Sequence, residues 1–274
     1  MPRILALSSQ VARGHVGLSA MIPAFHALGH DVIALPTVVL SNHPGHVASS
    51  GTRIAAETLR DMLDALWRND WMDDVAAVVT GYLPTPDHVA LAHDLVGRLR
   101  ARRTVLYLCD PVLGDDRPGI YIDPLAAALI RDRLAPLADV LTPNRFETGW
   151  LTGTRPGALG DVAETARALA GARLVAVTSA STLSGEVVNL LLHGETRMRA
   201  TVPWLDGVPH GTGDLFAALL LGHLLDGESD TDAFARAVSG VDHVVRASAG
   251  ADELRLVATV QAAAGAGSLA LAPL

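Results

Sequence analysis

The chain has 274 residues, half of them apolar, and 29 acidic against 21 basic residues give a formal net charge of −8. This length allows one large core, so we expect a single domain over residues 1–274. The acidic balance gives no basic footprint and so argues against nucleic acid or anionic membranes as partners. Only one cysteine, Cys109, is present, and no apolar run reaches membrane-spanning length. With no signal-peptide pattern at the start, these features favour a cytoplasmic enzyme.

The sequence contains no lysine, so all 21 basic residues are arginine. A P-loop nucleotide site needs a lysine on the phosphates, and an enzyme with pyridoxal phosphate as its coenzyme needs one for the aldimine. Both classes are excluded. A bound phosphate must instead be neutralised by metal ions, backbone N–H groups or arginine.

Short apolar runs typical of buried strands alternate with helical patterns through the first half of the chain. Strands are predicted at 4–7, 31–35, 75–80 and 104–109, and helices near 18–28, 54–69 and 87–102. Right-handed crossovers place the helices of such repeats on both faces of a parallel sheet. We therefore predict an α/β protein with three layers, α/β/α.

The second half continues this alternation and then becomes mostly helical. A helix near 125–134, strands at 140–142 and 174–178, and a helix near 163–170 precede an antiparallel edge hairpin, 187–192 with 196–202. Helices follow near 213–225, 231–249 and 254–264, and the Ala/Gly-rich tail from Ala262 is expected to fray. Two long irregular stretches, 36–51 and 114–123, are predicted to be ligand-binding loops at strand ends.

Gly211-Thr212-Gly213-Asp214 stands directly before the apolar run 215–221, at the predicted start of a helix. Glycines allow a tight turn around an anion, and the free N–H groups of a helix start can bind phosphate. Asp214 could then accept a proton from a substrate hydroxyl during phosphoryl transfer. The alternative is that Thr212 caps the helix and Asp214 only favours its dipole.

A helix N-terminus favours the ionised form of a carboxylate, which would make Asp214 a weak base. In a loose transition state the bond to the leaving group is largely broken before the alcohol attacks. We therefore expect late proton transfer, for which a positioned, ionised carboxylate suffices.

Polar residues also follow three other predicted strands. Asp110, before a proline, should project into the cleft and could hold a phosphate-bound cation, or could start a turn. Asn144 and Glu147 have the spacing of a capping box, while Glu147 could also act on Mg²⁺ carried by ATP. Thr178 and Ser179 could contact a phosphate or a monovalent cation, or belong to a turn.

The segments after the first two strands are candidates for binding a small ring. The glycine pattern after Ser9 is not GxGxxG, so no dinucleotide site is predicted. Ser9 and Val11 could meet the polar edge and the flat face of a ring. Thr37 and Ser41-Asn42-His43 form a polar cluster in the first long loop, where His43 could contact a ligand or be solvated.

Together these segments resemble the ribokinase-like superfamily and, within it, the pyridoxal kinases. The GTGD motif carries the resemblance to the superfamily. The first-loop serine, Ser41-Asn42-His43, Gly81-Tyr82-Leu83 and the segment CDPVLGD at 109–115 carry the resemblance to the pyridoxal kinases. Leu18 departs from the pattern, because many pyridoxal kinases have Asn at this position.

The resemblance implies ATP-dependent phosphorylation of the 5′-hydroxymethyl group of pyridoxal, with pyridoxine and pyridoxamine as further candidates. It also implies a ribokinase-like fold with a mostly parallel sheet and a homodimeric assembly. The alternatives are a kinase for hydroxymethylpyrimidine or another small alcohol, and a non-catalytic carrier of pyridoxal phosphate.

The resemblance further implies a role for each candidate residue. Asp214 would be the base, and the anion hole would comprise Gly211, Thr212 and Gly213. The vitamin pocket would comprise Ser9, Val11, Thr37, His43 and Tyr82. The nucleotide side would comprise the lid residues Asp115 and Tyr121 together with Thr178, Ser179 and Thr212. A monovalent cation such as K⁺ would lie near Asp110, Thr142 and Thr178, and Mg²⁺ would depend on Asn144 and Glu147.

Overall fold

The computed structural model describes residues 2–169, 171–182 and 185–274. Within these ranges a ten-stranded sheet has the order β12-β11-β10-β9-β8-β5-β4-β1-β2-β3. Its six central neighbours are parallel: β9 (Leu174–Ser181), β8 (Val140–Leu141), β5 (Leu106–Cys109), β4 (Val75–Thr80), β1 (Arg3–Val11) and β2 (Asp31–Leu40). The predicted parallel sheet is confirmed.

Antiparallel strands complete both edges of the sheet. On one edge lie β10 (Glu186–His193), β11 (Thr196–Pro203) and β12 (Ala272–Pro273), and on the other lies β3 (Gly51–Arg53). The predicted edge hairpin is therefore confirmed. The prediction that the tail frays is wrong at its end, because Pro273 pairs with Met198 of β11.

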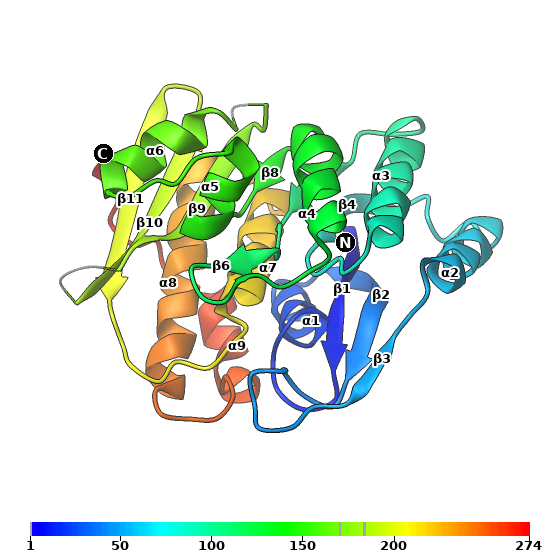
Figure 1. Ribbon diagram of the computed structural model, residues 1–274, viewed down its shortest axis with the longest axis horizontal. Helices are drawn as coiled ribbons and strands as arrows, with labels where there is room; N and C mark the ends of the chain where they lie inside the picture. Colours follow the sequence, from blue (N-terminus) through cyan, green and yellow to red (C-terminus); the bar gives the residue numbers. More distant parts are fainter. Residues whose placement is uncertain (1, 170, 183–184) are drawn as a thin grey trace.

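Helices cover both faces of this sheet (Figure 1). One layer contains α1 (Leu18–Ala27), α7 (Thr212–Leu225), α8 (Asp230–Ser248) and α9 (Leu256–Ala264). The other contains α2 (Ala56–Arg68), α3 (Pro86–Arg100), α4 (Pro124–Leu129), α5 (Arg145–Thr152) and α6 (Leu159–Arg167). The chain has the predicted three-layer α/β/α sandwich of the ribokinase-like fold.

Each face of the sheet packs into its own hydrophobic core. Leu5 and Leu7 of β1 belong to the core beneath α2–α6, while Ile4 and Ala6 belong to the core beneath α1 and α7–α9. Successive side chains of a strand point to opposite faces, so a strand covered on both sides must be apolar at every position. This burial explains the continuous apolar runs in the sequence.

The structure corrects several predicted boundaries. β2 continues to Leu40 because Val38 and its successors pair with β3, so the first long loop comprises only residues 41–50. The second contains a small hairpin of β6 (Gly114–Asp115) and β7 (Gly119–Ile120). The predicted helix 163–170 begins earlier, at Leu159, and its predicted last residue, Ala170, lies outside the described residues.

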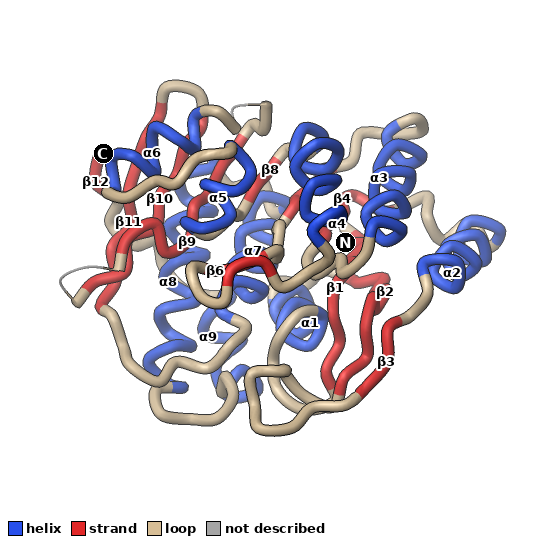
Figure 2. The backbone as a smooth tube through the Cα atoms, viewed as in Figure 1, coloured by secondary structure: helices blue, strands red, loops and turns tan. Residues whose placement is uncertain are grey.

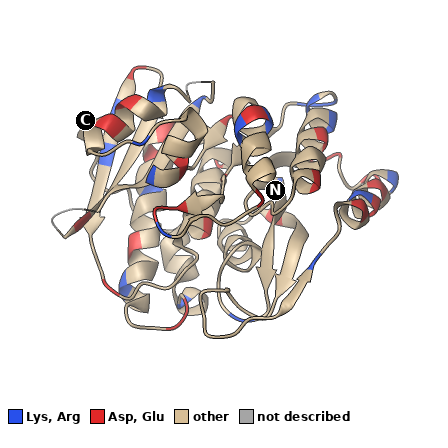
Figure 3. Cartoon of the chain, viewed as in Figure 1, with Lys and Arg blue, Asp and Glu red and all other residues tan. Residues whose placement is uncertain are grey.

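Long loops run along the lower edge of the molecule in Figure 2, and shorter connections lie at the upper edge. Acidic and basic residues lie mainly on the helices, with both signs mixed on α2 (Figure 3). In the described part of the chain, no helix combines the length and apolarity needed to cross a membrane.

Candidate active site

The start of α7 is a left-handed turn that only glycine fits. Gly211 is the residue before the helix and has a φ of 107°. A Cβ there would clash with the backbone carbonyl oxygen of His15. Since Gly211 has no side chain, nothing caps the helix from this position, and Thr212 is already its first residue. The alternative that Thr212 is the cap is therefore wrong.

The first turn of α7 leaves backbone donors free. Leu215 is the first residue whose N–H donates back into the turn, to the Gly211 carbonyl at 3.0 Å. Among the hydrogen bonds of the described residues, none uses the N–H of Thr212, Gly213 or Asp214 as its donor. Free N–H groups at a helix start attract an anion. The turn thus has the donors that an anion hole requires.

Asp214 lies in this turn with a raised pKa. Burial raises the pKa of its carboxyl from 3.8 to about 6, although a hydrogen bond from the Gly17 backbone opposes the rise. We expected the helix N-terminus to make Asp214 a weak base, and this expectation is wrong because desolvation outweighs the favourable backbone field. Asp214 is a stronger base than an exposed aspartate and is still mainly ionised above about pH 6.

Asp110 is buried at the carboxyl end of β5, close to other negative charges. Burial raises its pKa well above 3.8, and the charges of Glu147 and Asp214 raise it further. The Thr142 hydroxyl donates to Asp110 Oδ1 at 3.0 Å and opposes the rise only in part. The structure thus brings together three carboxylates, from the end of β5, from α5 and from the first turn of α7. Their mutual repulsion is largely uncompensated.

Glu147 forms the capping box that its spacing predicts. Its N–H donates to Asn144 Oδ1 at 2.8 Å, and the Asn144 N–H donates to Glu147 Oε2 at 2.9 Å. The N–H of Leu113 donates to the other oxygen, Oε1, at 2.9 Å. Burial nevertheless raises the pKa of Glu147 from 4.5 to about 7. The side chain therefore joins α5 to the segment before β6 and remains a buried, readily protonated carboxylate.

The segment with β6 and β7 brings Tyr121 near the same carboxylates. Its N–H donates to the Leu113 carbonyl at 3.1 Å, and its ring is partly exposed. Burial raises the pKa of Tyr121 above its usual 10.0, and the charges of Glu147 and Asp110 raise it further. Asp115 contributes to the same effect from β6. Both predicted lid residues thus lie beside the candidate site.

Thr178 and Ser179 lie near the end of the last parallel strand. The Thr178 N–H donates to the Pro143 carbonyl at 2.9 Å, and Thr178 forms a β-bridge with Asn144. Ser179 has a φ of 48°, and its N–H donates to Asn189 Oδ1 at 3.0 Å. Asn189 was not predicted as a site residue. The available signal was one polar residue within an apolar strand.

The residues predicted to line the vitamin pocket separate into two groups. Thr37 is fully buried, and its hydroxyl donates to the Tyr82 carbonyl at 2.7 Å. The Tyr82 N–H donates to the hydroxyl of Ser8, at 3.1 Å, a residue that the sequence did not single out. Val11 is buried, and Ser9 is half-buried against Gly17. Thr37 and Ser8 thus hold the Tyr82 backbone in place.

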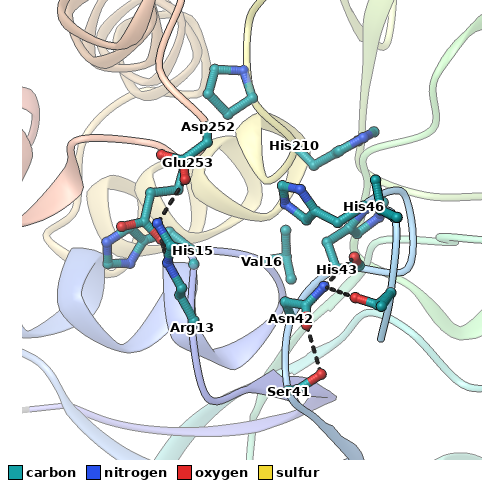
Figure 4. Close-up of a pocket in the computed structure, with 14 residues that line it drawn as sticks. Arg13, His15, Val16, Ser41, Asn42, His43, His46, His210, Asp252 and Glu253 are labelled. Atoms are coloured by element: carbon teal, nitrogen blue, oxygen red, sulfur yellow. Dashed lines mark hydrogen bonds and ion pairs between the residues drawn. The ribbon is translucent and has the colours of Figure 1, made fainter. Parts of the chain in front are cut away.

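His43 instead lines a cavity of about 530 Å³ beside the start of α7. The cavity lies between the β1–α1 loop, the 41–50 loop, the segment before α7 and the α8–α9 loop (Figure 4). Four histidines share its lining: His15, His43, His46 and His210. Ser9, Val11, Thr37 and Tyr82 are not among its lining residues. Leu18 is fully buried in a hydrophobic core, so it does not face this cavity.

The described residues contain no group of three or more histidine, cysteine or acidic side chains arranged to hold a metal ion alone. Asp110 and Glu147 could therefore hold a cation only together with other ligands, such as phosphate oxygens and water.

Residues 12–256 match the family model described as phosphomethylpyrimidine kinase. A pyridoxal kinase of Corynebacterium diphtheriae is 32% identical over 263 residues, which are 93% of this chain and 92% of the relative. The chain belongs to the pyridoxal kinase family. A pyridoxine/pyridoxal/pyridoxamine kinase of Bordetella bronchiseptica is 37% identical over 85% of each chain, so the family predicted from the sequence is confirmed.

Solved structures of the family share this fold. Pyridoxal kinase from Leishmania donovani in complex with ADP and pyridoxamine superposes with a TM-score of 0.92 at 28% identity, over the full length of both chains. Pyridoxal kinase from Entamoeba histolytica gives a TM-score of 0.94 over the full length of both chains. At 24% identity, the second match supports the fold alone.

Proposed function

We propose that this protein transfers the γ-phosphoryl group of ATP to the 5′-hydroxymethyl group of pyridoxal, and also acts on pyridoxine and pyridoxamine. The observation that carries the proposal is the start of α7. There, free N–H groups lie beside a carboxylate whose pKa is raised to about 6. The complexes of the Leishmania donovani relative with ADP and pyridoxamine, and with ADP and pyridoxine, support the substrates.

The reaction would proceed by in-line displacement at the γ-phosphorus. The hydroxyl oxygen of the vitamer bonds to phosphorus as the bond to the bridging oxygen of ADP breaks. The hydroxyl proton passes to Asp214, which a pKa of about 6 leaves ionised and ready to accept it at neutral pH. The N–H groups of Thr212, Gly213 and Asp214 would stabilise the negative charge on the transferred phosphoryl group. ADP would then leave as the second product.

The carboxylates around Asp110 fit a cation that arrives with the phosphates. Glu147 and Asp110 are buried, and their raised pKa values show that nearby positive charge does not compensate them. We propose that Asn144 and Glu147 contact Mg²⁺, directly or through water, and that Asp110, Thr142 and Thr178 contact a monovalent cation such as K⁺. Bound Mg²⁺ would neutralise phosphate charge. Asp115, Tyr121 and Ser179 would complete the nucleotide side.

A substrate panel tests the proposed activity. Purified protein with Mg-ATP is supplied separately with pyridoxal, pyridoxine, pyridoxamine, hydroxymethylpyrimidine and ribose, and each phosphorylated product is quantified. We expect the pyridoxal-type vitamers to have the highest kcat/KM. A preference for the pyrimidine or the sugar would replace the substrate assignment. Binding of pyridoxal phosphate with no ATP turnover would instead indicate a carrier.

We also propose that residues 1–274 form one kinase domain, that the protein is cytoplasmic, and that it is a homodimer. The two hydrophobic cores share every central strand, which supports a single folding unit. Sedimentation equilibrium at several protein concentrations tests the dimer. A constant mass of about one chain, 28.6 kDa, would contradict it.

A further inference from the structure

Two histidine rings from distant segments stack beside the candidate anion hole. The ring centroids of His43, in the 41–50 loop, and His210, directly before Gly211, lie 3.8 Å apart, and the ring planes differ by 23°. Figure 4 shows both rings at the cavity. No predicted role uses His210. Because His210 adjoins the turn of α7, the stack connects a cavity loop to the phosphate-binding segment.

The 41–50 loop is internally braced, so the stack positions it as a unit. The Ser41 N–H donates to the Ser50 carbonyl at 2.7 Å and closes the loop at its base. The Asn42 side chain donates to the Ala48 carbonyl at 2.9 Å across the loop. A loop braced in this way moves largely as one body, and its tip carries His43.

The stack requires a neutral His43 ring. The Gly45 N–H donates to His43 Nδ1 at 3.0 Å, so this nitrogen carries no proton and the ring proton lies on Nε2. A second proton on Nδ1 would break that bond, and two charged rings 3.8 Å apart would repel each other. The pKa of His43 is lowered from 6.5 to about 4, mainly by burial and further by the charges of His210 and His46.

Several other charged groups face the two rings. Burial and His46 lower the pKa of His210, and Asp115 of β6 opposes this. The remaining charged or titratable groups around the cavity are Arg13 and His15 of the β1–α1 loop and Asp252 and Glu253 of the α8–α9 loop. Arg13 is paired with Asp252 at 2.6 Å, so these two charges largely cancel.

We propose that His210 is a positioning residue whose neutral ring, stacked on His43, holds the 41–50 loop over the cavity beside the Gly211–Asp214 turn. The inference rests on the proposed function, since closure of this loop should tighten binding of the alcohol substrate. His210 acts through His43 and not on the reacting atoms. The closed arrangement is fully present above about pH 6.5 and is lost as the pH falls toward about 4, where His43 takes up its proton.

Kinetics of two His210 variants test the role. His210→Ala removes the ring and should raise KM for pyridoxal roughly three- to tenfold at pH 7.5, the range expected for one aromatic pair, without changing kcat or KM for ATP. His210→Phe keeps a stacking ring that cannot ionise and should remain within about twofold of the parent protein. The matched control is His243→Ala, at an exposed histidine of α8. A wild-type KM in His210→Ala would overturn the proposal.

The acid dependence separates positioning from a purely structural role. Below about pH 6.5 the wild-type KM for pyridoxal should rise, because protonation breaks the stack. In His210→Phe the rise should be smaller, since a charged imidazole is attracted to a phenyl face. Equal pH profiles for the two proteins would contradict the proposal.

Gly45 offers an independent way to separate the rings. A Cβ at this position would lie 2.9 Å from His43 Nδ1 and 3.0 Å from His210 Nε2. The backbone of Gly45 is not in the left-handed conformation, so alanine would not strain it. Gly45→Ala should therefore push the rings apart and reproduce the higher KM for pyridoxal. An unchanged KM in this variant would count against the stack.

Titration of His43 by NMR tests the stack without relying on activity. With ring-labelled histidine, the pKa of His43 should rise in His210→Ala, because the His43 ring becomes less buried and no longer has a second histidine beside it that opposes its protonation. An unchanged His43 titration would overturn the stack even if the protein is an active kinase. A shifted titration in a protein that phosphorylates no vitamer would instead reject the proposed function and retain the stack.

Discussion

Asp214 combines two features that oppose each other in the folded chain. Its position in the first turn of α7 favours a negative charge, while its burial raises its pKa from 3.8 to about 6. A carboxylate with this pKa is a useful proton acceptor near neutral pH because it is ionised yet still basic. The energetic cost of its desolvation is thus borne by the folded protein before any substrate binds.

Asp214→Asn should lower kcat by roughly 10²- to 10⁴-fold, the contribution typical of a positioned acid or base. ATP binding should persist, since the backbone N–H groups of the turn remain. Steady-state kinetics and calorimetric ATP titration measure the two effects. Asp94→Asn, at an exposed carboxylate of α3, is the control. Near-normal turnover in Asp214→Asn would remove Asp214 from the mechanism.

Glu147→Gln tests whether this carboxylate does more than cap α5. Glutamine can keep the geometry of a capping box but loses the charge, so the helix should persist while the Mg²⁺ concentration for half-maximal rate rises by about 10- to 100-fold. Activity at increasing Mg²⁺ measures the change. Glu164→Gln, on the exposed side of α6, is the control. An identical Mg²⁺ titration would leave Glu147 with its structural role alone.

The elements around the site are held together by close backbone approach. The β1–α1 loop packs its His15 carbonyl against Gly211, and Gly17 of the same loop packs against Ser9. Gly17 also provides the backbone hydrogen bond to Asp214. The position of the β1–α1 loop therefore influences both the Gly211–Asp214 turn and the charge state of Asp214.

Gly211→Ala should destabilise the protein by about 2 kcal/mol or more, because alanine is strained at positive φ and its Cβ meets a backbone oxygen. Gly213 is the matched control: nothing lies within 4 Å of a Cβ there, and its φ is not left-handed. Gly213→Ala should therefore keep the wild-type midpoint of denaturant unfolding. Equal midpoints for both variants would show that the close approach at Gly211 is relaxed in solution.

At the scale of the whole molecule, buried carboxylates should make the ligand-free protein less stable as the pH rises. Their pKa values are raised on folding, so between about pH 4 and 7 the folded state binds more protons than the unfolded state. The free energy of unfolding must then fall with rising pH. Mg²⁺ and ATP should oppose this loss, since ligands that bind only the folded state stabilise it.

Asp214→Asn isolates this effect from all other titrating groups. Relative to wild type, the variant should gain stability as the pH rises from 4 to 7, by up to about 3 kcal/mol for a pKa raised by about two. Urea unfolding of both proteins across this range measures the difference. A difference that is constant with pH would show that Asp214 is not desolvated.

The absence of lysine from the whole sequence has a chemical consequence. Neither the aldehyde of pyridoxal nor that of its phosphate can form an aldimine with a side-chain amine. Borohydride reduction in the presence of either compound should leave every side chain unlabelled in peptide mass spectra. A labelled internal peptide would contradict this expectation.

Local sequence patterns were sufficient for most of the elements and for the family. The apolar runs predicted the parallel sheet because strands covered on both faces must be apolar throughout. The Asn144–Glu147 spacing predicted a capping box, which the structure confirms. Features that depend on segments far apart in the chain, such as Asn189 bonding to Ser179, left no readable pattern beyond one polar residue in a strand.

The sequence by itself determined the fold class, the family, the exclusion of lysine-dependent chemistry and the location of the GTGD turn. These depend on periodicity, composition and contiguous motifs, all of which are local. Only the tertiary structure decided the raised pKa of Asp214, the hydrogen bond from the buried Thr37 to Tyr82 and the stacking of His43 on His210. Desolvation and contacts between distant segments arise when the layers pack together, so no local pattern specifies them.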